Sequence, residues 1–579
     1  MNGWHGRILK VDLTRGSHHH EDIPLKLLEE YLGGRALGVR LMRDHYKLMP
    51  FSSEMPLVFA TGPLCGTAAP STAQLSVVSR SPLTNTIYDC SLGGSFPWSM
   101  KAAGIDALFI IGKSPEPVVL TINGDKVEIL SAVSLWGSDV PAAVAALKEN
   151  GPVAAIGPAG ESGVLFANIV VGDGNSVGRG GLGAVMGSKN LKAITVDGNF
   201  KTDIADLRAF DNSCRDVMRL FTASPVIFGP LGISEFGTTV LVDLIAQRRM
   251  TPTENFRKTY FDRSVNYSAT TINKVCSPAK SGCYGCPIKC GKISESGKYL
   301  PEYDSVSHFG ALNGIGSLDA IIKANDICNK LGMDPVSAAA AISAYGEIRG
   351  AFATADELPE LLGDIAGRHG DGELLSRGAK RLAEKMGRPE FSMSVKSLEL
   401  PPYDPRGAYG MALSYCTSNR GGCHLSAYPI SHEILRKPVP TDRFSFSGKA
   451  RIISIAEDTN AAIDSLSVCK FAFLGATLEE YAELLTAVTG LSYSPERLKE
   501  IGARTVMTER YYNCANGFSR KDDILPERFF KECGSSGYGM DINGIDRSRF
   551  NVELDKYYRI RGLNSNGCFD EDVFLDQQP

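Results

Sequence analysis

Cys283-Tyr284-Gly285-Cys286-Pro287-Ile288-Lys289-Cys290 is the strongest local signal in this sequence of 579 residues. Its three cysteines have CxxCxxxC spacing on a segment that contains glycine and proline, so a tight loop can turn all three sulfurs toward one metal centre. Cysteine thiolates hold either iron–sulfur clusters or zinc. A four-iron cluster needs four ligands, so we expect a fourth cysteine from elsewhere in the chain. The spacing alone favours a cluster and a structural zinc site with four cysteine ligands about equally.

A glycine-rich loop, Gly178-Arg179-Gly180-Gly181-Leu182-Gly183, lies upstream of the cysteines. It formally matches GxGxxG, and Asp197 lies about where a ribose-binding acid would stand. The segment between Ala184 and Lys192 contains Gly187 and is too short for the crossover helix of a nicotinamide-binding unit. We therefore expect a loop whose backbone amides meet anionic phosphates. A loop that binds no ligand is an equal alternative from this segment alone.

Two side chains are candidates for acid–base catalysis. His424 lies in Asn419-Arg420-Gly421-Gly422-Cys423-His424 and has an imidazole whose ordinary pKa is near neutrality. Glu302, in Pro301-Glu302-Tyr303-Asp304, follows the cysteine loop closely. Each also has a simpler interpretation. His424 can be a hydrogen-bonded structural histidine, and Glu302 can be a solvated carboxylate. The run His18-His19-His20 stands beside acids and predicts a solvated surface rather than a metal site.

Strand patterns dominate residues 1 to about 200. Ile8–Leu13 alternates at period two, and Val118–Ile122 and Lys126–Leu130 flank the turn residues Asn123-Gly124-Asp125, which predicts a hairpin. Further buried strands are expected at Leu108–Ile111 and Ala193–Val196, and one helix at Leu25–Met42.

Helical patterns dominate from about residue 201. Ala324, Ile327, Cys328 and Leu331 share one helix face; Asp334-Pro335 then opens a helix over Val336–Glu347, and Ser494-Pro495-Glu496 opens another toward Tyr512. The turn-rich stretch Leu400–Gly407 separates two helical regions. We predict an α+β fold with a β-sheet-rich, cofactor-binding domain over residues 1–200 and two mostly α-helical domains. The first, over 201–398, carries the cysteine loop, and the second, over 399–579, carries His424.

The composition is that of a soluble globular protein, with 43% hydrophobic and 22% charged residues. A formal net charge of −4 argues against a broad electrostatic footprint for nucleic acid or anionic membrane. Met1–Gly6 lacks an export signal, and no run approaches the ~20 apolar residues of a spanning helix. Fourteen cysteines in so long a chain are not a disulfide scaffold, so we expect a cytoplasmic, reducing environment.

Taken together and in this order, the motifs resemble those of the aldehyde:ferredoxin oxidoreductase family, the tungsten-pterin enzymes. The resemblance runs along nearly the whole chain. Its segments are Gly6–Leu13, Ala60–Leu64, Ser81–Thr84, Ile156–Glu161, Gly178–Lys192, the cysteine loop, Leu400–Arg406, Asn419–His424 and Ala462–Ser465 with Cys469.

The resemblance implies three cofactors. A [4Fe–4S] cluster would be held by Cys283, Cys286, Cys290 and Cys469, so that the last domain also carries the fourth cluster cysteine. Tungsten or molybdenum would be held by two pyranopterin dithiolenes, and a Mg²⁺ ion would bridge the pterin phosphates. Ser91 and Ser176 match positions that bind this Mg²⁺ through backbone carbonyls, and Glu302 and His424 match the acid–base residues near the metal.

The resemblance also implies which residues contact the pterins. They are Gln74, Ser91, Gly93, Asn175, Ser176, Gly178, Asn329, Met333, Asp334, Asp464, Cys469 and Lys470. Two family motifs for pterin binding correspond to Asn329–Asp334 and Asp464–Cys469.

Several positions depart from the family pattern and indicate a divergent member. Gln74 and Asn175 stand where characterised members carry arginines, and a neutral amide keeps hydrogen-bond donors but loses charge. Asn329 replaces an aspartate, and Ser467-Val468 replaces Gly-Leu. Lys323 and Asp326 fall where some members carry an ExxH pair for an iron between two subunits, so the sequence does not support that iron.

The implied function is oxidation of an aldehyde to the carboxylic acid under anaerobic conditions. Electrons would leave through the cluster to ferredoxin or to a small iron–sulfur subunit. One alternative is a carboxylic-acid or benzoyl-CoA-type reductase of the same superfamily, and another is a zinc-stapled, non-catalytic scaffold. A homodimer and a hetero-oligomer are both compatible with the sequence.

Overall fold

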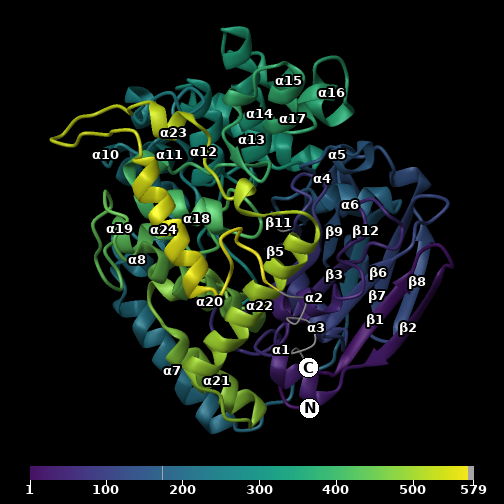
Figure 1. Cartoon of the computed structure of the whole chain (residues 1–579). Helices are drawn as coiled ribbons and strands as arrows, with labels where there is room; N and C mark the ends of the chain where they lie inside the picture. The colour runs from purple at the N-terminus through teal and green to yellow at the C-terminus, as the bar shows by residue number, and fades with distance from the viewer. Residues whose placement is uncertain (173, 571–579) are drawn as a thin grey trace.

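The computed structural model describes residues 1–172 and 174–570 of the chain (Figure 1). Two six-stranded sheets form the N-terminal part, and helices dominate the rest. In Figure 1 the purple and blue strands fill one side of the molecule, and the green and yellow helices fill the other. The predicted α+β class is therefore confirmed. The domain boundaries at residues 200 and 398 stay a prediction.

The first sheet has the strand order β2-β1-β6-β3-β4-β5. The strand β1 pairs in parallel with β6, and the other neighbours pair antiparallel. Its strands are β1 (Arg7–Asp12), β2 (Ser17–Asp22), β3 (Leu57–Thr61), β4 (Gln74–Arg80), β5 (Ile87–Gly93) and β6 (Ala107–Ile111). The predicted strands at Ile8–Leu13 and Leu108–Ile111 are confirmed. His18–His20 lie on the edge strand β2 at the surface, as expected.

The second sheet has the strand order β11-β10-β9-β12-β7-β8. Its strands are β7 (Val118–Asn123), β8 (Lys126–Ser131), β9 (Val153–Ala155), β10 (Ile169–Val171), β11 (Ser176–Val177) and β12 (Leu191–Asp197). The predicted hairpin is confirmed, because β7 pairs antiparallel with β8 in a register that places Asn123 opposite Lys126. Gly124 has a φ of +57° in this turn, which glycine adopts without strain.

One hydrophobic core joins the two sheets. Phe59 and Val77 of the first sheet and Leu120 and Ile194 of the second belong to the same buried cluster. Successive strand residues point to opposite faces, so the alternating apolar positions of both sheets can face each other. The helices α3 (Phe96–Ala102) and α6 (Leu182–Ser188) also contribute to this core.

The glycine-rich loop leads from β11 directly into α6, so residues 182–188 are helical although the segment is short. The strands β10 and β9 separate β11 from β12 in the sheet, and every pairing between them is antiparallel. A dinucleotide-binding unit needs a helix between two parallel neighbouring strands. This part of the fold is therefore not a nicotinamide site.

The single helix expected over Leu25–Met42 is wrong. The chain forms α1 (Leu25–Tyr31) and α2 (Gly34–Leu41), with a break at Leu32 and Gly33. A Cβ atom at Gly33 would lie 2.3 Å from the Thr61 carbonyl oxygen, and one at Gly34 would lie 2.1 Å from that of Asp464. The helix breaks because two backbone segments from distant parts of the chain pack directly against these glycines.

Three predicted helices are confirmed with their starting signals. The helix with Ala324 and Cys328 is α13, Asp334 caps α14 by accepting a hydrogen bond from the Val336 amide, and Ser494 caps α22. These three and the other helices of seven or more residues not described above have the following bounds: α4 (Val140–Leu147), α7 (Leu207–Ala223), α10 (Leu241–Gln247), α11 (Ala269–Cys276), α12 (Tyr303–Phe309), α13 (Leu318–Leu331), α14 (Pro335–Arg349), α15 (Leu358–Gly367), α17 (Ala379–Lys385), α18 (Tyr409–Thr417), α20 (Lys449–Leu466), α21 (Leu478–Thr489), α22 (Pro495–Ala515) and α24 (Arg547–Ile560). Shorter helices are α5 (Pro158–Ser162), α8 (Pro225–Phe228), α9 (Ile233–Phe236), α16 (Gly372–Leu375), α19 (Ile430–Glu433) and α23 (Arg528–Lys531).

One segment, Pro225–Gln247, is long and apolar enough to cross a membrane by length and composition, with a mean hydropathy of 1.4. The expectation that no run approaches this limit is therefore too strict. The structure divides the segment into α8, α9, a 3-10 turn and α10, and 44% of its apolar window is buried inside the protein. A spanning segment must satisfy its backbone within one continuous helix, so this segment is weak support for a membrane span.

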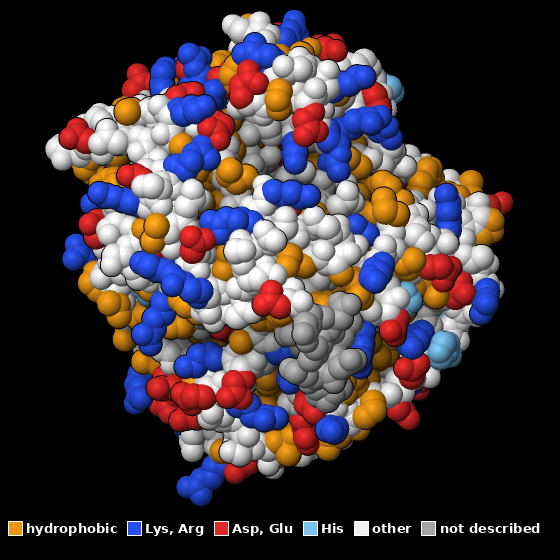
Figure 2. Space-filling model, viewed as in Figure 1, with side chains coloured by type: hydrophobic (Ala, Val, Ile, Leu, Met, Phe, Trp, Pro, Cys, Tyr) orange, Lys and Arg blue, Asp and Glu red, His pale blue; other side chains and the backbone are white. Residues whose placement is uncertain are grey.

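The distribution of surface charge and the pairing of the cysteines agree with what the composition predicts. Lysine, arginine and acidic side chains alternate over the face that Figure 2 shows, without a large area of one sign. One disulfide joins Cys514 at the end of α22 to Cys568, and the other twelve cysteines form none. The cysteines are thus not a disulfide scaffold.

The close approach at Gly34 predicts a large loss of stability for Gly34→Ala. The new methyl group would overlap the Asp464 carbonyl and the residue would hold a φ of +43°. We expect a loss of about 2–4 kcal/mol in the free energy of unfolding. Gly350→Ala is the matched control, because Gly350 has a φ of +75° and no neighbour within 4 Å. Equal thermal-unfolding midpoints for the two variants would contradict the proposed packing.

Candidate active site

Four cysteines line one small cavity. Cys283, Cys286 and Cys290 come from the loop between the strands β13 (Ala279–Ser281) and β14 (Gly291–Ile293), and Cys469 follows α20. The cavity wall is completed by Ser71, Ala73, Gln74, Gly282, Ile288 and Phe471. The structure thus brings the lone cysteine of the C-terminal region to the three of the loop.

The neighbouring thiols disfavour the ionisation of Cys290 and Cys469. Burial raises the pKa of Cys290, and Glu302 and the other three thiols raise it further. Burial also raises the pKa of Cys469, followed by the effects of Cys283 and Cys286. Four thiolates in one cavity therefore need a cation among them, which is the environment of a metal centre.

The four thiols are not placed to hold a single zinc ion. Zinc holds its cysteine sulfurs at ~2.3 Å, so four of them must lie within about 4 Å of one another. No group of three or more His, Cys, Asp or Glu side chains in residues 1–172 and 174–570 is placed to hold one metal ion. A [4Fe–4S] cluster spreads four cysteine ligands around a larger body.

Three polar side chains, Gln74, Ser71 and Asn175, reach the thiols from the N-terminal region. Gln74 Nε2 lies 3.5 Å from Cys283 Sγ, and Ser71 Oγ lies 3.4 Å from Cys286 Sγ. The Ser71 carbonyl oxygen also accepts a hydrogen bond from the Cys469 amide at 2.9 Å. Such contacts orient ligands and tune the potential of a cluster. Sequence reasoning missed Ser71, because only the fold places it beside a cysteine.

Gly93 lets the first sheet approach the cysteine loop. A Cβ atom at Gly93 would lie 2.6 Å from both Cys283 Sγ and Gln74 Nε2, and 3.2 Å from Asn175 Oδ1. Gln74 pairs with Gly93 across β4 and β5, and β5 contacts β11. The structure therefore gathers one group of the predicted cofactor residues at this edge: Gln74, Ser91, Gly93, Asn175, Ser176 and Gly178.

Both motif aspartates are buried and held by cations. Asp464 lies 3.3 Å from Arg35 Nη1, forms an ion pair with Lys470 and accepts a hydrogen bond from Ser91 Oγ at 3.3 Å. Asp334 Oδ2 lies 3.3 Å from Arg179 Nε. Their side chains are therefore fixed before any cofactor binds. Met333 is buried beside Asp334, and Asn329 lies half-buried in the last turn of α13.

Arg179 of the glycine-rich loop joins three segments. Besides Asp334, its guanidinium donates to the carbonyl oxygens of Glu399 at 2.6 Å and Gly422 at 3.2 Å. Burial lowers the pKa of Arg179, but Asp334, Tyr88, Cys423 and Glu399 together outweigh this and raise it, so the group stays charged. Gly422 lies two residues before His424, so Arg179 connects the glycine-rich loop to the histidine.

Glu302, Asp304 and His424 form the titratable part of the site. His424 Nε2 lies 3.7 Å from Asp304 Oδ2, which is longer than a hydrogen bond. Glu302 stands at the N-terminus of α12 and lies near enough to Cys290 and Asp304 to raise the pKa of both. Glu302 thus lies close to both a cavity thiol and Asp304. Sequence reasoning missed Asp304, although the acid two residues after Glu302 was a visible signal.

Burial sets the charge of these three groups. It raises the pKa of Glu302, and it raises the pKa of Asp304 to about 7 although Arg179 acts against it. Burial and then Arg179 lower the pKa of His424 well below its ordinary value, so His424 is neutral at pH 7. The Glu302 residue nevertheless keeps an exposed surface.

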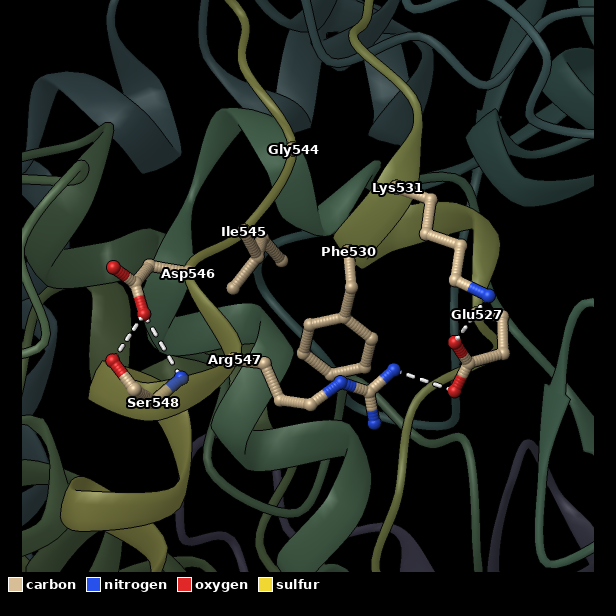
Figure 3. Close-up of a pocket in the computed structure, with 8 residues that line it drawn as sticks. All are labelled: Glu527, Phe530, Lys531, Gly544, Ile545, Asp546, Arg547 and Ser548. Carbon is tan, nitrogen blue, oxygen red and sulfur yellow. Dashed lines mark hydrogen bonds and ion pairs between the residues drawn. The ribbon is translucent and has the colours of Figure 1, made fainter.

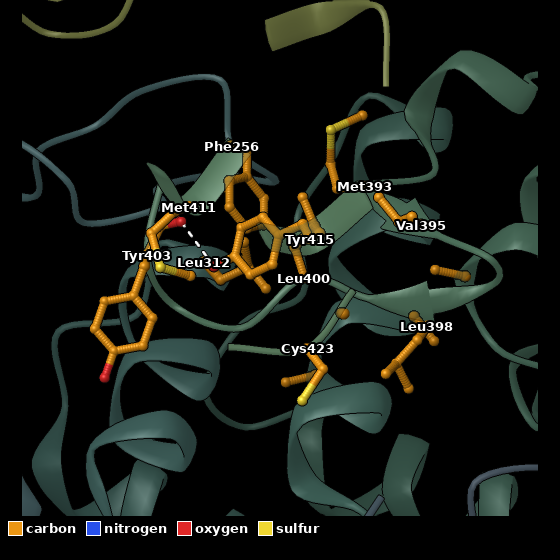
Figure 4. Packing of buried hydrophobic residues seen from close by; sticks show 14 of the residues in the cluster. Phe256, Leu312, Met393, Val395, Leu398, Leu400, Tyr403, Met411, Tyr415 and Cys423 are labelled. Carbon is orange, nitrogen blue, oxygen red and sulfur yellow. Dashed lines mark hydrogen bonds between the residues drawn. The ribbon is translucent and has the colours of Figure 1, made fainter. Parts of the chain in front are cut away.

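Aromatic rings fix the position of His424. Its ring centroid lies 5.4 Å from that of Tyr403 and 6.0 Å from that of Tyr428. Tyr403 is buried, and its carbonyl oxygen accepts a hydrogen bond from Tyr415 at 3.0 Å (Figure 4). Cys423 belongs to the same buried cluster. The segment before the histidine is therefore anchored in the core.

A second recess of about 720 Å³ lies at the surface beside α23 and α24 (Figure 3). Arg547 lies over the Phe530 ring and forms an ion pair with Glu527, so its charge is already compensated. None of the predicted site residues lines this recess, and it is not part of the candidate site.

Comparison with known proteins agrees with this geometry. The family model "Aldehyde ferredoxin oxidoreductase, N-terminal domain" matches residues 8–198, and "Aldehyde ferredoxin oxidoreductase, domains 2 & 3" matches residues 212–574. The chain is 37% identical to the tungsten-containing aldehyde ferredoxin oxidoreductase of Pyrococcus abyssi, over 99% of this chain and 98% of that protein. It is also 37% identical to the corresponding protein of Pyrococcus furiosus, over 98% and 97%.

Two more distant relatives have other activities. The WOR-like subunit of the aliphatic sulfonate oxidoreductase of Pyrococcus furiosus is 27% identical, over 99% of this chain and 96% of that protein. The solved active site complex BamBC of benzoyl coenzyme A reductase with 1,5-dienoyl-CoA contains a chain with a TM-score of 0.85 and 24% identity, over 99% and 97%, which shows the fold. The two family models and the 37% identity over nearly full length decide the assignment: this chain is an oxidoreductase that belongs to the aldehyde ferredoxin oxidoreductase family.

Proposed function

We propose that this chain oxidises an aldehyde to the carboxylic acid as a tungsten- or molybdenum-pterin enzyme. The observation that carries the proposal is the convergence of four distant thiols beside Glu302, Asp304 and His424, in a relative of tungsten-containing aldehyde ferredoxin oxidoreductases. In the reaction an aldehyde and a water molecule give the acid, two protons and two electrons. The electrons would leave one at a time to ferredoxin or to an iron–sulfur subunit.

The residues of the site fit these cofactors. Cys283, Cys286, Cys290 and Cys469 would hold a [4Fe–4S] cluster, because they line one cavity and repel one another without a cation. Asp334 and Asp464 would bind the two pterins, since each is buried and fixed by a cation.

The edge formed by Gly93 and Gly178 would meet the phosphates, with the Ser91 and Ser176 carbonyls directed to Mg²⁺. When bound, the metal–pterin group supplies the two-electron redox chemistry.

The protein's own groups handle the protons. Neutral His424 can donate a hydrogen bond to the aldehyde oxygen, and Tyr403 and Tyr428 hold its ring. Asp304 Oδ2 faces His424 and, with a pKa of about 7, can accept a proton at neutral pH. Glu302 lies close to both Asp304 and the thiols, so it can relay the proton away as the electrons leave.

Among the alternatives, reduction of a carboxylic acid or of a benzoyl-CoA-type thioester has less support. The benzoyl coenzyme A reductase chain shares the fold at 24% identity, whereas the aldehyde ferredoxin oxidoreductases reach 37%. A zinc-stapled scaffold would need closely spaced ligands and would not need an acid–histidine pair. A cytoplasmic, anaerobic setting remains part of the proposal.

Cys469→Ser tests the cluster. The variant should lose most of the iron, from about four atoms per chain, and the visible absorbance of an anaerobically purified protein. Cys533→Ser is the control, because Cys533 is an exposed thiol outside the cavity. One zinc per chain without iron in the wild type would favour the scaffold instead.

His424→Ala should lower aldehyde turnover by about 10²–10⁴-fold while the metal and iron contents stay unchanged. Turnover is measured with benzyl viologen as the electron acceptor. His369→Ala is the control, because His369 is exposed beyond α15. Full activity of a fully loaded His424→Ala protein would remove this residue from the mechanism.

The pH profile tests Asp304. Its ionised form is the proton acceptor, so turnover should rise with pH through about 7, the pKa of this partly buried carboxyl. In Asp304→Asn the rising limb should disappear, whereas Asp326→Asn on α13 should keep it. A limb near pH 7 that persists in Asp304→Asn would assign the titration to another group.

A further inference from the structure

The surface around the cysteine loop has a charge opposite to that of the chain. From Arg263 to Ser294 the sequence contains five cations, Arg263, Lys274, Lys280, Lys289 and Lys292, and no Asp or Glu. The whole chain has a formal net charge of −4. Positive charge is therefore concentrated on the segment that supplies three of the four cavity thiols.

Most of this charge reaches solvent. Lys274, Lys280 and Lys289 are exposed, whereas Lys292 is buried and donates to the Ser234 carbonyl at 3.1 Å. Glu235 of α9 pairs with Lys280 at 2.7 Å and offsets that lysine. Exposed Lys274 and Lys289 form no ion pair within the described residues 1–172 and 174–570, so this surface attracts a negatively charged partner.

An exposed aromatic ring lies on the cysteine loop itself. Tyr284 lies between Cys283 and Cys286, and 53% of its surface is exposed. Its ring centroid is 4.5 Å from that of Trp98 on α3, and its amide donates to the Gly94 carbonyl at 3.3 Å. The ring is thus held in place although it faces solvent. Aromatic residues are enriched at the centres of protein interfaces.

The backbone beside this ring is open to close approach. Gly282 and Gly285 flank Cys283 and Tyr284 and are exposed, so no side chain shields the loop there. A Cβ atom at Gly282 would lie 2.9 Å from the Lys289 Cα, which places Lys289 next to this opening. We name the surface of Trp98, Lys274, Lys280, Tyr284 and Lys289 the cluster face.

We propose that the cluster face docks a small ferredoxin-type electron carrier whose own surface is acidic. The inference rests on the proposed function, because it assigns the exit of the electrons from that site. For each aldehyde oxidised, two oxidised carriers would each bind here in turn and each accept one electron. The cysteine loop is the part of the cavity wall that reaches solvent, so a carrier on this face comes nearest to the thiols.

Charge reversal tests the electrostatic part of the proposal. We would measure the Kd of a purified, acidic two-[4Fe–4S] bacterial ferredoxin for the anaerobically purified protein, for Lys289→Glu and for Lys274→Glu. At low salt each variant should bind about tenfold more weakly, and the difference should shrink at 0.5 M NaCl because salt screens exposed charges. Lys274 lies outside the cysteine loop, so this variant keeps all four thiols in place.

Lys385→Glu is the matched control. It makes the same change of net charge at an exposed lysine of α17, which packs against α14 and away from the cluster face. This variant should bind ferredoxin with the wild-type Kd. Tyr284→Ala should also weaken binding, but its effect should persist at high salt because the lost contact is apolar.

Turnover with two acceptors separates this inference from the proposed function. Lys274→Glu and Lys289→Glu should keep the wild-type rate with benzyl viologen, while the KM for ferredoxin rises about tenfold. Wild-type Kd and KM values for ferredoxin in both variants would overturn the docking proposal. A wild-type protein that binds ferredoxin at this face but oxidises no aldehyde with viologen would instead overturn the proposed function.

Discussion

Four thiols, whose ionised forms repel one another, must be held together in one cavity at the junction of two distant parts of the chain. Glycines make that junction possible. Gly34 and Gly62 let the N-terminal backbone touch Asp464 and Leu466 directly, and Gly93 lets the first sheet touch Cys283. The Cys469 amide then donates to the Ser71 carbonyl at 2.9 Å. Because no side chain intervenes, the position of Cys469 is tied to the backbone of the first sheet.

Buried ion pairs fix the orientation of the same junction. Arg35 lies 2.8 Å from Glu509 and 3.3 Å from Asp464, while Arg179 connects Asp334 to the carbonyls of Glu399 and Gly422. Removing one partner of a buried pair leaves an uncompensated charge, which costs about 3–5 kcal/mol. The two motif acids are therefore positioned by the fold rather than by a ligand.

The groups proposed for proton chemistry and for electron exit both lie close to Glu302. His424 lies among tyrosine rings and faces Asp304, and burial, followed by the charge of Arg179, has the largest effect on the pKa values of both. The cysteine loop reaches solvent at Tyr284 and Lys289. This arrangement leaves the proposed electron path open to a protein partner.

The sequence by itself determined the local elements: the strands Arg7–Asp12 and Val118–Ser131 with their turn, the capped helices α14 and α22, and the CxxCxxxC loop. These follow from periodicity, turn residues and caps, which act over a few residues. Only the tertiary structure broke the expected helix at Gly33, placed Ser71 and Gln74 beside the thiols and set Asp304 opposite His424. Each of these depends on contacts between segments far apart in the chain. Burial at those contacts also shifts the pKa values of Asp304 and His424.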